Sequence, residues 1–305
     1  MASSASSRLL AEGEDWDPAF IYGTAWKKER TRELVKLAVE KGFRSVDTAA
    51  QPKHYQEALV GEALRELYQD QHGKVSRGNI YLQTKYTTPA GQDLNNMPYD
   101  ASAPLETQIR TSVASSLRNL RPLEDTEDSS YVDCLLLHSP LPTTEQTIEA
   151  WKILESYIPD KIRTLGISNV TLPILKAIYE NSTIKPSVVQ NRFYPQTRYD
   201  ISLRAFCNQH DISYQSFWTL TGNPRLLKSD PVTRLVNAVG VSRSIALYAL
   251  VMDQGIIVLN GTTSVEHMDE DFDGIRKIRE WALGHAKEWQ EVVGVFKSSV
   301  QSTGL

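Results

Sequence analysis

Short apolar runs rich in β-branched residues alternate along this chain with longer amphipathic segments. Such alternation is typical of βα units, in which each parallel strand is joined to the next by a helix. The strands are expected at 20–23, 44–47, 80–85, 132–138, 164–168, 187–191, 212–216 and 255–259. The helices are expected at 31–41, 56–69, 104–120, 145–157, 172–181, 202–210 and as a pair within 230–252. The pattern predicts an α/β fold, a single-domain (β/α)8 TIM barrel with its active site at the C-terminal face of the strands.

The domain organisation follows from length and composition. A chain of 305 residues is ordinary for one such barrel, and no shift of composition divides it. We expect a flexible tail over residues 1–18 and the barrel over 19–305. Two polar stretches, 86–103 and 218–229, follow the third and seventh strands as long loops. Because long loops in compact domains are usually functional, we interpret both as walls of a substrate pocket.

Charge and cysteine content exclude several classes of protein. The formal net charge is -4 and the pI is about 5.9, with Lys and Arg scattered along the chain. Nucleic acid is therefore not expected as a partner. No apolar stretch reaches the roughly 20 residues of a membrane span, and the N-terminus lacks an apolar h-region, so we expect no membrane association and a cytoplasmic location. Cys134 and Cys207 are expected to be buried free thiols, and no Cys/His spacing indicates a metal site.

Polar residues stand where a barrel would gather them at one mouth. Asp47, Lys85 and His138 lie at or just beyond the ends of three expected strands, and Tyr55 follows soon after Asp47. In a (β/α)8 barrel the C-terminal strand ends form the active-site face. Taken singly, each residue has an ordinary explanation, such as a helix cap, a surface lysine, a core histidine or a tyrosine packed over the barrel. Their recurrence at strand ends favours a functional site.

Six motifs extend this observation over most of the chain. They occur in the order GTAWK, GFRSVDTAA, LQTKY, VDCLLLHSP, IRTLGISN and VVQN, each at the strand expected to carry it. In this order the chain resembles the aldo-keto reductase superfamily from Gly23 to Asp271. The resemblance implies a carbonyl reductase in which Tyr55, Lys85, Asp47 and His138 are catalytic.

One departure from the family pattern concerns the catalytic tyrosine. The position five residues after the aspartate of DTA is Pro52 here, and the first tyrosine is Tyr55. The segment QEALVGEAL after Tyr55 matches the helix that follows the tyrosine in the family, and its Val60-Gly61 lies only one position closer to the tyrosine than usual. We therefore interpret the DTAAQPKHY loop as lengthened, with Tyr55 as the proton donor.

Carbonyl reduction explains why these residue types are needed together. It requires a hydride at carbon and a proton at oxygen, and the protein supplies positioning, electrostatics and the proton. The unperturbed pKa of a phenol is about 10, so we expect the Lys85 ammonium to lower the pKa of Tyr55. Asp47 would keep Lys85 charged and oriented. His138 could hydrogen-bond the substrate oxygen or share the proton.

The resemblance also implies a nicotinamide site. Ser168, Asn169 and Gln190 match positions that bind the carboxamide, with capping and turn formation as the alternative role. Thr24 and Ala25 would line the mouth of the first strand, and Asp47 also borders this cofactor site. At the seventh strand, Gln215 replaces the tyrosine that normally stacks under the nicotinamide, so Phe217 or Trp218, after Ser216, could replace that ring.

The segment after the eighth strand aligns with the family's site for the adenosine 2′-phosphate and adenine. Many members carry Lys and Arg there, whereas this chain has Gly261 and His267, with Thr262, Thr263 and Asp271 nearby. Hydroxyls and backbone N–H groups at a helix N-terminus can still hold phosphate. We expect NADPH as the cofactor, with NADH use as the alternative.

The substrate is a small-molecule carbonyl whose identity the residues leave open. Trp26, Tyr86, Ser139 and Trp218 are expected to line its pocket, and Ser139 stands where many members carry tryptophan, which predicts a widened pocket for a bulky, aromatic or natural-product carbonyl. We expect a monomer or weak dimer. Two alternatives remain: a redox-sensing, nicotinamide-binding regulatory subunit with the same fold, and a phosphate-binding isomerase or lyase without nicotinamide.

Overall fold

The computed structural model describes residues 19–70, 75–124 and 129–302. The expected tail over 1–18 lies outside the described residues. The strands follow one another in the order of a closed parallel barrel, which confirms the predicted (β/α)8 fold. They are β1 (Phe20–Gly23), β2 (Ser45–Asp47), β3 (Tyr81–Tyr86), β4 (Val132–Leu137), β5 (Ile162–Ser168), β6 (Val188–Arg192), β7 (Ser213–Phe217) and β8 (Ile257–Asn260).

Helices follow the strands as the alternation predicts. The α-helices are α1 (Thr31–Glu40), α2 (Glu57–Gln69), α3 (Leu105–Asn119), α4 (Thr144–Glu155), α5 (Leu172–Asn181), α6 (Ile201–Gln209), α7 (Asp230–Val239), α8 (Arg243–Met252), α9 (Val265–Gly284) and α10 (Ala286–Ser302). Short 3-10 helices are η2 (Lys28–Arg30), η3 (Arg77–Asn79), η4 (Pro89–Gly91), η5 (Pro195–Asp200) and η6 (Leu226–Lys228).

The break between α7 and α8 has the local causes that the sequence indicates. Gly240 adopts a left-handed φ of 76° at the C-cap of α7, a conformation that a residue without Cβ tolerates. The Ser242 side chain then accepts a hydrogen bond from the Ile245 backbone N–H and begins α8. Among the described helices, none alone is long and apolar enough to cross a bilayer, although α7 and α8 would qualify by length and composition if joined across their 112° bend.

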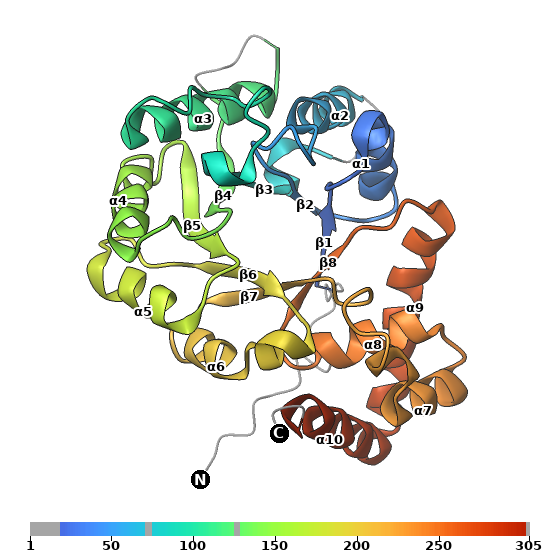
Figure 1. Ribbon diagram of the computed structural model, residues 1–305. Helices are drawn as coiled ribbons and strands as arrows, with labels where there is room; N and C mark the ends of the chain where they lie inside the picture. Colours follow the sequence, from blue (N-terminus) through green and yellow to red (C-terminus); the bar gives the residue numbers. More distant parts are fainter. Residues whose placement is uncertain (1–18, 71–74, 125–128, 303–305) are drawn as a thin grey trace. The chain divides into compact units, whose positions relative to one another are not determined.

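Two compact units are distinguished by their internal contacts, and each is described separately. The first comprises residues 21–190 and 209–212. It contains β1 to β5 and most of β6, with α1 to α5 outside the strands they follow (Figure 1). Its strands pair in parallel register, so that Asp47 lies opposite Gln83 and Ser168 lies opposite Gln190. This register brings the polar strand ends to the same edge.

Close helix packing fixes the start of α2 in this unit. A Cβ at Gly61 would collide with the backbone carbonyl of Asn119 at the end of α3. The two helices therefore approach each other at a position where only hydrogen fits. This contact anchors the helix that directly follows Tyr55.

The other unit comprises the described residues up to Phe20, with 191–208 and 213–302. It contains β7, β8, the end of β6, most of α6 and α7 to α10. Phe20 packs edge-on against Tyr248 of α8 and Phe272 of α9, with ring centroids 5.3 Å and 5.6 Å away. These aromatic contacts pack Phe20 against α8 and α9 of the same unit.

Both cysteines have the state that the sequence predicts. Cys134 and Cys207 are buried free thiols. Burial raises the pKa of each thiol to about 12, against an ordinary value near 9. Neither group is therefore a thiolate at neutral pH, and both act as small apolar fillers of the core.

Candidate active site

A buried ion pair forms the centre of the candidate site. Lys85 of β3 donates from Nζ to Asp47 Oδ2 at 2.5 Å and to the Thr48 carbonyl at 2.8 Å. The side chains of Lys85 and Asp47 are 0% and 2% exposed. Burial lowers the pKa of Lys85, and the Asp47 carboxylate opposes that effect. The pair is thus held in one geometry, because each buried charge would be uncompensated without the other.

The second carboxylate oxygen of Asp47 is bound by two amides. Gln83 Nε2 donates to Asp47 Oδ1 at 2.6 Å, and Gln190 Nε2 donates to the same atom at 3.0 Å. Gln83 lies two residues before Lys85 on β3, so both side chains point to the same side of the sheet. The carboxylate therefore links β2, β3 and β6, and its orientation toward Lys85 is fixed.

Tyr55 lies beside this pair in the loop between β2 and α2. Lys85 Nζ is 5.1 Å from the centre of the Tyr55 ring, and the His138 ring centroid is 5.9 Å from it in an edge-on arrangement. The structure therefore brings together all four residues predicted to be catalytic. The DTAAQPKHY loop places Tyr55 beside Lys85 and His138.

The predicted lowering of the Tyr55 pKa is wrong for this structure. Burial raises the pKa of the phenol above its ordinary value, and the negative charge of Asp47 raises it further. The physical reason is that a buried phenolate loses hydration. Tyr55 therefore retains its proton, which is the form that a proton donor requires.

The His138 ring is oriented by its neighbours. Its Nδ1 lies 2.6 Å from Thr87 Oγ1, and its backbone carbonyl accepts from Asn169 Nδ2 at 2.9 Å. The backbone N–H of His138 continues the ladder to the Tyr86 carbonyl. The Thr87 contact orients the imidazole, whose plane is inclined by 72° to the Tyr55 ring.

The three residues predicted to bind the carboxamide also lie together. Ser168 Oγ donates to the Gln190 carbonyl at 2.7 Å, and Asn169 Nδ2 donates to Ser168 Oγ at 3.2 Å. Asn169 has a left-handed φ of 54°, which asparagine adopts more readily than bulky residues. Two amides and a hydroxyl offer both donors and acceptors, which matches the needs of a carboxamide. The donor set fits a nicotinamide.

The end of β1 is joined to the same site through backbone contacts. The N–H and Oγ1 of Thr24 both donate to the Asp47 carbonyl, at 3.0 Å and 2.9 Å. Ala25 and Trp26 follow in a turn, and Trp26 is 66% exposed. The Trp26 N–H donates to the carbonyl of His54 at 2.7 Å, directly before Tyr55. The predicted first-strand residues therefore border the tyrosine loop.

Two residues of this unit that were predicted to line the substrate pocket, Tyr86 and Ser139, differ in their exposure to solvent. Tyr86 is only 1% exposed, packs against Tyr99 and donates from Oη to Gln108 Oε1 of α3 at 3.3 Å. Successive strand residues face opposite sides of a sheet, so Tyr86 points away from the side where Lys85 lies. The structure therefore does not bring Tyr86 into the cluster, and we correct the expectation that it lines the pocket. Ser139 is partly exposed next to His138.

Sequence reasoning missed a buried carboxylate two residues after Tyr55. Glu57 begins α2 and accepts hydrogen bonds from Thr84 Oγ1 at 2.5 Å, Ser116 Oγ at 2.9 Å and Asn119 Nδ2 at 3.0 Å. Burial raises the pKa of Glu57, and these hydrogen bonds oppose that effect. A Glu in a first helical turn normally suggests only a favourable helix dipole, so no sequence signal indicated this network.

The predicted nicotinamide-stacking residues belong to the other unit. Gln215 and Ser216 are buried in β7, and Ser216 Oγ lies 2.9 Å from Thr219 Oγ1. Trp218 is 51% exposed with a left-handed φ of 59°. The Arg192 guanidinium, which sequence reasoning missed, lies 4.7 Å from the Trp218 ring centre and 5.1 Å from that of Phe217. Both candidate rings are thus in contact with a cation.

The predicted adenosine segment is a hydrogen-bonded turn before α9. The Thr262 N–H donates to Asn260 Oδ1 at 3.0 Å, and the His267 N–H donates to Ser264 Oγ at 3.2 Å, which caps the helix. Gly261, Thr263 and His267 are exposed. Exposed hydroxyls, backbone and an imidazole at a helix N-terminus fit a phosphate, although with less positive charge than Lys and Arg would supply.

Asp271 has a different position from these exposed groups. It is buried, and its Oδ2 accepts from Asn260 Nδ2 at 2.6 Å. Burial raises the pKa of Asp271 from 3.8 to about 6. Its carboxylate therefore anchors the turn through Asn260.

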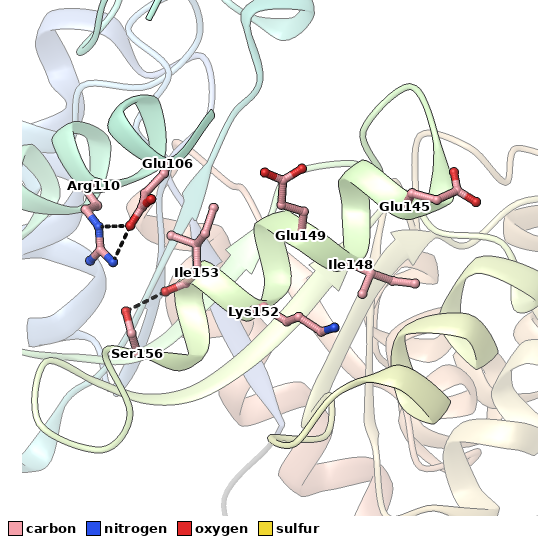
Figure 2. Close-up of a pocket in the computed structure, with 8 residues that line it drawn as sticks. All are labelled: Glu106, Arg110, Glu145, Ile148, Glu149, Lys152, Ile153 and Ser156. Carbon is pink, nitrogen blue, oxygen red and sulfur yellow. Dashed lines mark hydrogen bonds and ion pairs between the residues drawn. The ribbon is translucent and has the colours of Figure 1, made fainter. Parts of the chain in front are cut away.

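A hollow on the outer surface is separate from this chemistry. It lies between α3 and α4 and is lined by Glu106, Arg110, Glu145, Ile148, Glu149, Lys152, Ile153 and Ser156 (Figure 2). Arg110 pairs with Glu106 one helical turn away at 2.8 Å. Exposed pairs of this kind contribute little energy and indicate a solvated face. Within the described ranges, no group of three or more His, Cys, Asp and Glu side chains is placed to hold a metal ion.

The sequence of this chain is similar to those of several known proteins. The profile of the Aldo/keto reductase family matches residues 19–237. Methylglyoxal reductase DkgB of Escherichia coli O157:H7 is 28% identical over 260 residues, which cover 83% of this chain and 85% of that protein. The NAD/NADP-dependent indole-3-acetaldehyde reductase of Schizosaccharomyces pombe is 28% identical over 269 residues, covering 83% and 84%.

Solved structures support the fold alone. A Bombyx mori aldo-keto reductase in complex with NADP superposes with a TM-score of 0.67 at 21% identity, over 86% of this chain and 88% of that chain. An aldo-keto reductase from a Medee basin deep-sea metagenome library gives 0.68 at 20% identity, over 86% and 90%.

Proposed function

Because this chain belongs to the aldo/keto reductase family, we propose that it reduces an aldehyde or ketone to an alcohol with NAD(P)H, using Tyr55 as the proton donor. The observation that carries the proposal is the position of the Tyr55 ring, whose centre lies 5.1 Å from Lys85 Nζ and 5.9 Å from the centre of the His138 ring. Two relatives are named for the reduction of methylglyoxal and of indole-3-acetaldehyde, which are both carbonyl compounds.

Each residue of the cluster has a distinct task in this reaction. A nicotinamide held by Ser168, Asn169 and Gln190 would supply the hydride that the carbonyl carbon needs. Tyr55 transfers its phenolic proton to the carbonyl oxygen, and the product is the alcohol. The Lys85 ammonium stabilises the phenolate that remains, until the phenol regains a proton from solvent.

The surrounding groups hold this arrangement. Asp47 fixes the Lys85 ammonium through the 2.5 Å contact. Thr87 orients the His138 imidazole, which would hydrogen-bond the substrate oxygen. Ser168, Asn169 and Gln190 would hold the carboxamide so that the hydride faces the same carbonyl.

We assign NADPH as the cofactor, with NADH also accepted. The turn at 261–267 supports this choice because its hydroxyls, backbone and His267 suit a phosphate while offering no Lys or Arg.

The two buried free thiols support a reducing cytosol as the location. We expect the enzyme to act as a monomer or weak dimer.

The test is the replacement of Tyr55 by Phe, which removes one oxygen. With NADPH and 4-nitrobenzaldehyde, followed by the loss of nicotinamide absorbance, we expect kcat to fall about 10²- to 10⁴-fold, the usual contribution of a positioned proton donor. Tyr179→Phe, on α5, is the matched control and should keep wild-type activity. Equal rates in wild type and Tyr55→Phe would refute the assignment.

A further inference from the structure

The lengthened loop before Tyr55 contains a histidine that stacks on the exposed Trp26. The ring centroids of His54 and Trp26 are 3.8 Å apart with planes inclined by 37°. The His54 carbonyl also accepts from the Trp26 N–H at 2.7 Å. One residue therefore holds both the backbone and the ring of Trp26, directly before the proposed proton donor.

The Trp26 side chain is mostly exposed, so packing in the core does not hold it in place and the contacts with His54 do. The indole is 66% exposed, and its backbone has a left-handed φ of 64°. That conformation is unfavourable for a bulky side chain and persists only where neighbouring groups impose it. A large aromatic surface is thus kept in solvent at the border of the Tyr55 loop.

The His54 ring is itself fixed from the loop after β3. Its Nδ1 lies 2.9 Å from Gln51 Oε1, and Gln51 Nε2 donates to the Gly91 carbonyl at 2.6 Å. A second amide, Gln92 Nε2, donates to the Ala50 carbonyl at 2.7 Å. The lengthened loop is therefore tied at two points to the polar loop that we interpret as a pocket wall.

Charge supports a stacking role for this imidazole. Partial burial lowers the pKa of His54, and the neighbouring Lys53 lowers it further. The ring therefore stays neutral at pH 7 and packs on the indole as an aromatic plane.

We propose that His54 is a specificity-determining residue: it holds the Trp26 indole as a flat wall beside Tyr55, and this wall selects carbonyls conjugated to a planar aromatic ring over small aliphatic ones. The inference rests on the proposed reductase function. An aromatic substrate gains a stacking contact with the exposed indole, whereas an aliphatic aldehyde lacks a matching face.

The experiment compares His54→Ala with His54→Phe, which keeps an aromatic ring, and with Lys53→Ala, a neighbouring exposed control. Each is assayed with NADPH against 4-nitrobenzaldehyde and against propanal. We expect His54→Ala to raise KM for the aromatic aldehyde about three- to tenfold, which corresponds to the usual worth of an aromatic pair. Its kcat, and kcat/KM for propanal, should stay within about twofold. His54→Phe and Lys53→Ala should keep the wild-type preference.

A double-mutant cycle with Trp26→Ala separates this role from a structural one. In the Trp26→Ala background, His54→Ala should change the aromatic-to-aliphatic ratio of kcat/KM no further. An equal loss of kcat for both aldehydes would overturn the proposal, because His54 would then only support the Tyr55 loop. An unchanged ratio in His54→Ala would overturn it as well. A wild-type protein that reduces neither aldehyde would instead refute the reductase function.

Discussion

Two regions of the chain treat polar groups in opposite ways. In the unit of residues 21–190 and 209–212, Asp47 is buried and accepts hydrogen bonds from Lys85, Gln83 and Gln190. In the other unit, the turn before α9 and the first turns of that helix present exposed Gly261, Thr263 and His267, and the buried carboxylate of Asp271 accepts a hydrogen bond from the Asn260 amide. The first region is a preformed electrostatic arrangement, whereas the second exposes backbone, hydroxyls and the carboxylates of Glu266, Asp269 and Glu270.

The difference indicates where substitutions are costly. Removing one partner of a buried ion pair leaves an uncompensated charge, whereas changing an exposed turn alters only the local contacts. The reaction should therefore depend strictly on the first region. The second region should have only a weak influence on the preference between NADPH and NADH. Substitutions in that region should therefore be able to change the preference.

The largest effect is expected for Lys85→Met, which leaves Asp47 buried without its cation. We expect the free energy of unfolding to fall by about 3–5 kcal/mol, because the remaining carboxylate loses its ammonium partner. Carbonyl reduction should be lost together with this stability. Urea unfolding measures the first effect, and NADPH oxidation measures the second.

The matched control is Lys36→Met. Lys36 pairs with Glu66 at 2.8 Å, with both side chains about a third exposed, and exposed pairs contribute less than about 1 kcal/mol. A Lys85→Met protein that unfolds at the wild-type urea concentration would show that the buried pair is not coupled to the fold.

The second largest loss of stability is expected for substitution of Glu57, another buried carboxylate of the first region. Glu57→Ala removes the acceptor shared by Thr84, Ser116 and Asn119. Buried donors without partners cost about 1–3 kcal/mol each, although relaxation reduces the sum, so we expect a loss of about 3 kcal/mol. Because α2 follows Tyr55 directly, kcat should also fall.

Glu57→Gln keeps the shape and one carbonyl acceptor, so it should retain more stability than Glu57→Ala. Glu40→Ala, at the exposed end of α1, is the control for loss of a carboxylate. If Glu57→Ala matches Glu40→Ala in its urea midpoint, the network has no structural role.

The fold was largely accessible from the sequence because periodicity determines it. Alternating β and α segments predicted all eight strands within about two residues of their observed bounds. The eighth strand begins at Ile257, two residues later than predicted, because Gly255 adopts a left-handed φ of 77° in the preceding turn. Such a turn is set by backbone geometry, which hydropathy alone does not report.

Residues of the site could be predicted from the sequence only where they stand at strand ends. Asp47, Lys85 and His138 could be placed together because parallel strands end at one edge. His54 and Glu57 could not, because their roles arise from contacts with residues distant in the chain. The Tyr86 error has a simple cause: side-chain direction alternates along a strand, and its neighbour Lys85 already occupies the inner side.

Asp271 offers a pH test of the second region. Its pKa is raised from 3.8 to about 6, so between these values the folded protein binds more protons than the unfolded chain. The free energy of unfolding therefore falls as pH rises through this interval, by no more than about 3 kcal/mol. Asp271→Asn lacks this titration and should flatten that dependence.

Urea midpoints measured from pH 4 to pH 7 would test this expectation. The stability of Asp271→Asn relative to wild type should rise across the interval and then level off. Asp269→Asn, at an exposed position two residues earlier, is the control and should run parallel to wild type. A parallel curve for Asp271→Asn would contradict the raised pKa.

The smallest effect is expected for Gly261→Lys, which would give the second region the cation that it lacks. A lysine in this turn could form a charge-assisted hydrogen bond with a 2′-phosphate, so NADPH binding should tighten about fivefold to tenfold while NADH binding stays nearly unchanged. The gain should shrink as salt is added, because the position is exposed. Gly284→Lys adds the same charge at the exposed far end of α9 and should leave the ratio of dissociation constants as in wild type. If Gly261→Lys and Gly284→Lys bind both dinucleotides equally, the turn does not contact the phosphate and cofactor preference is set by another part of the chain.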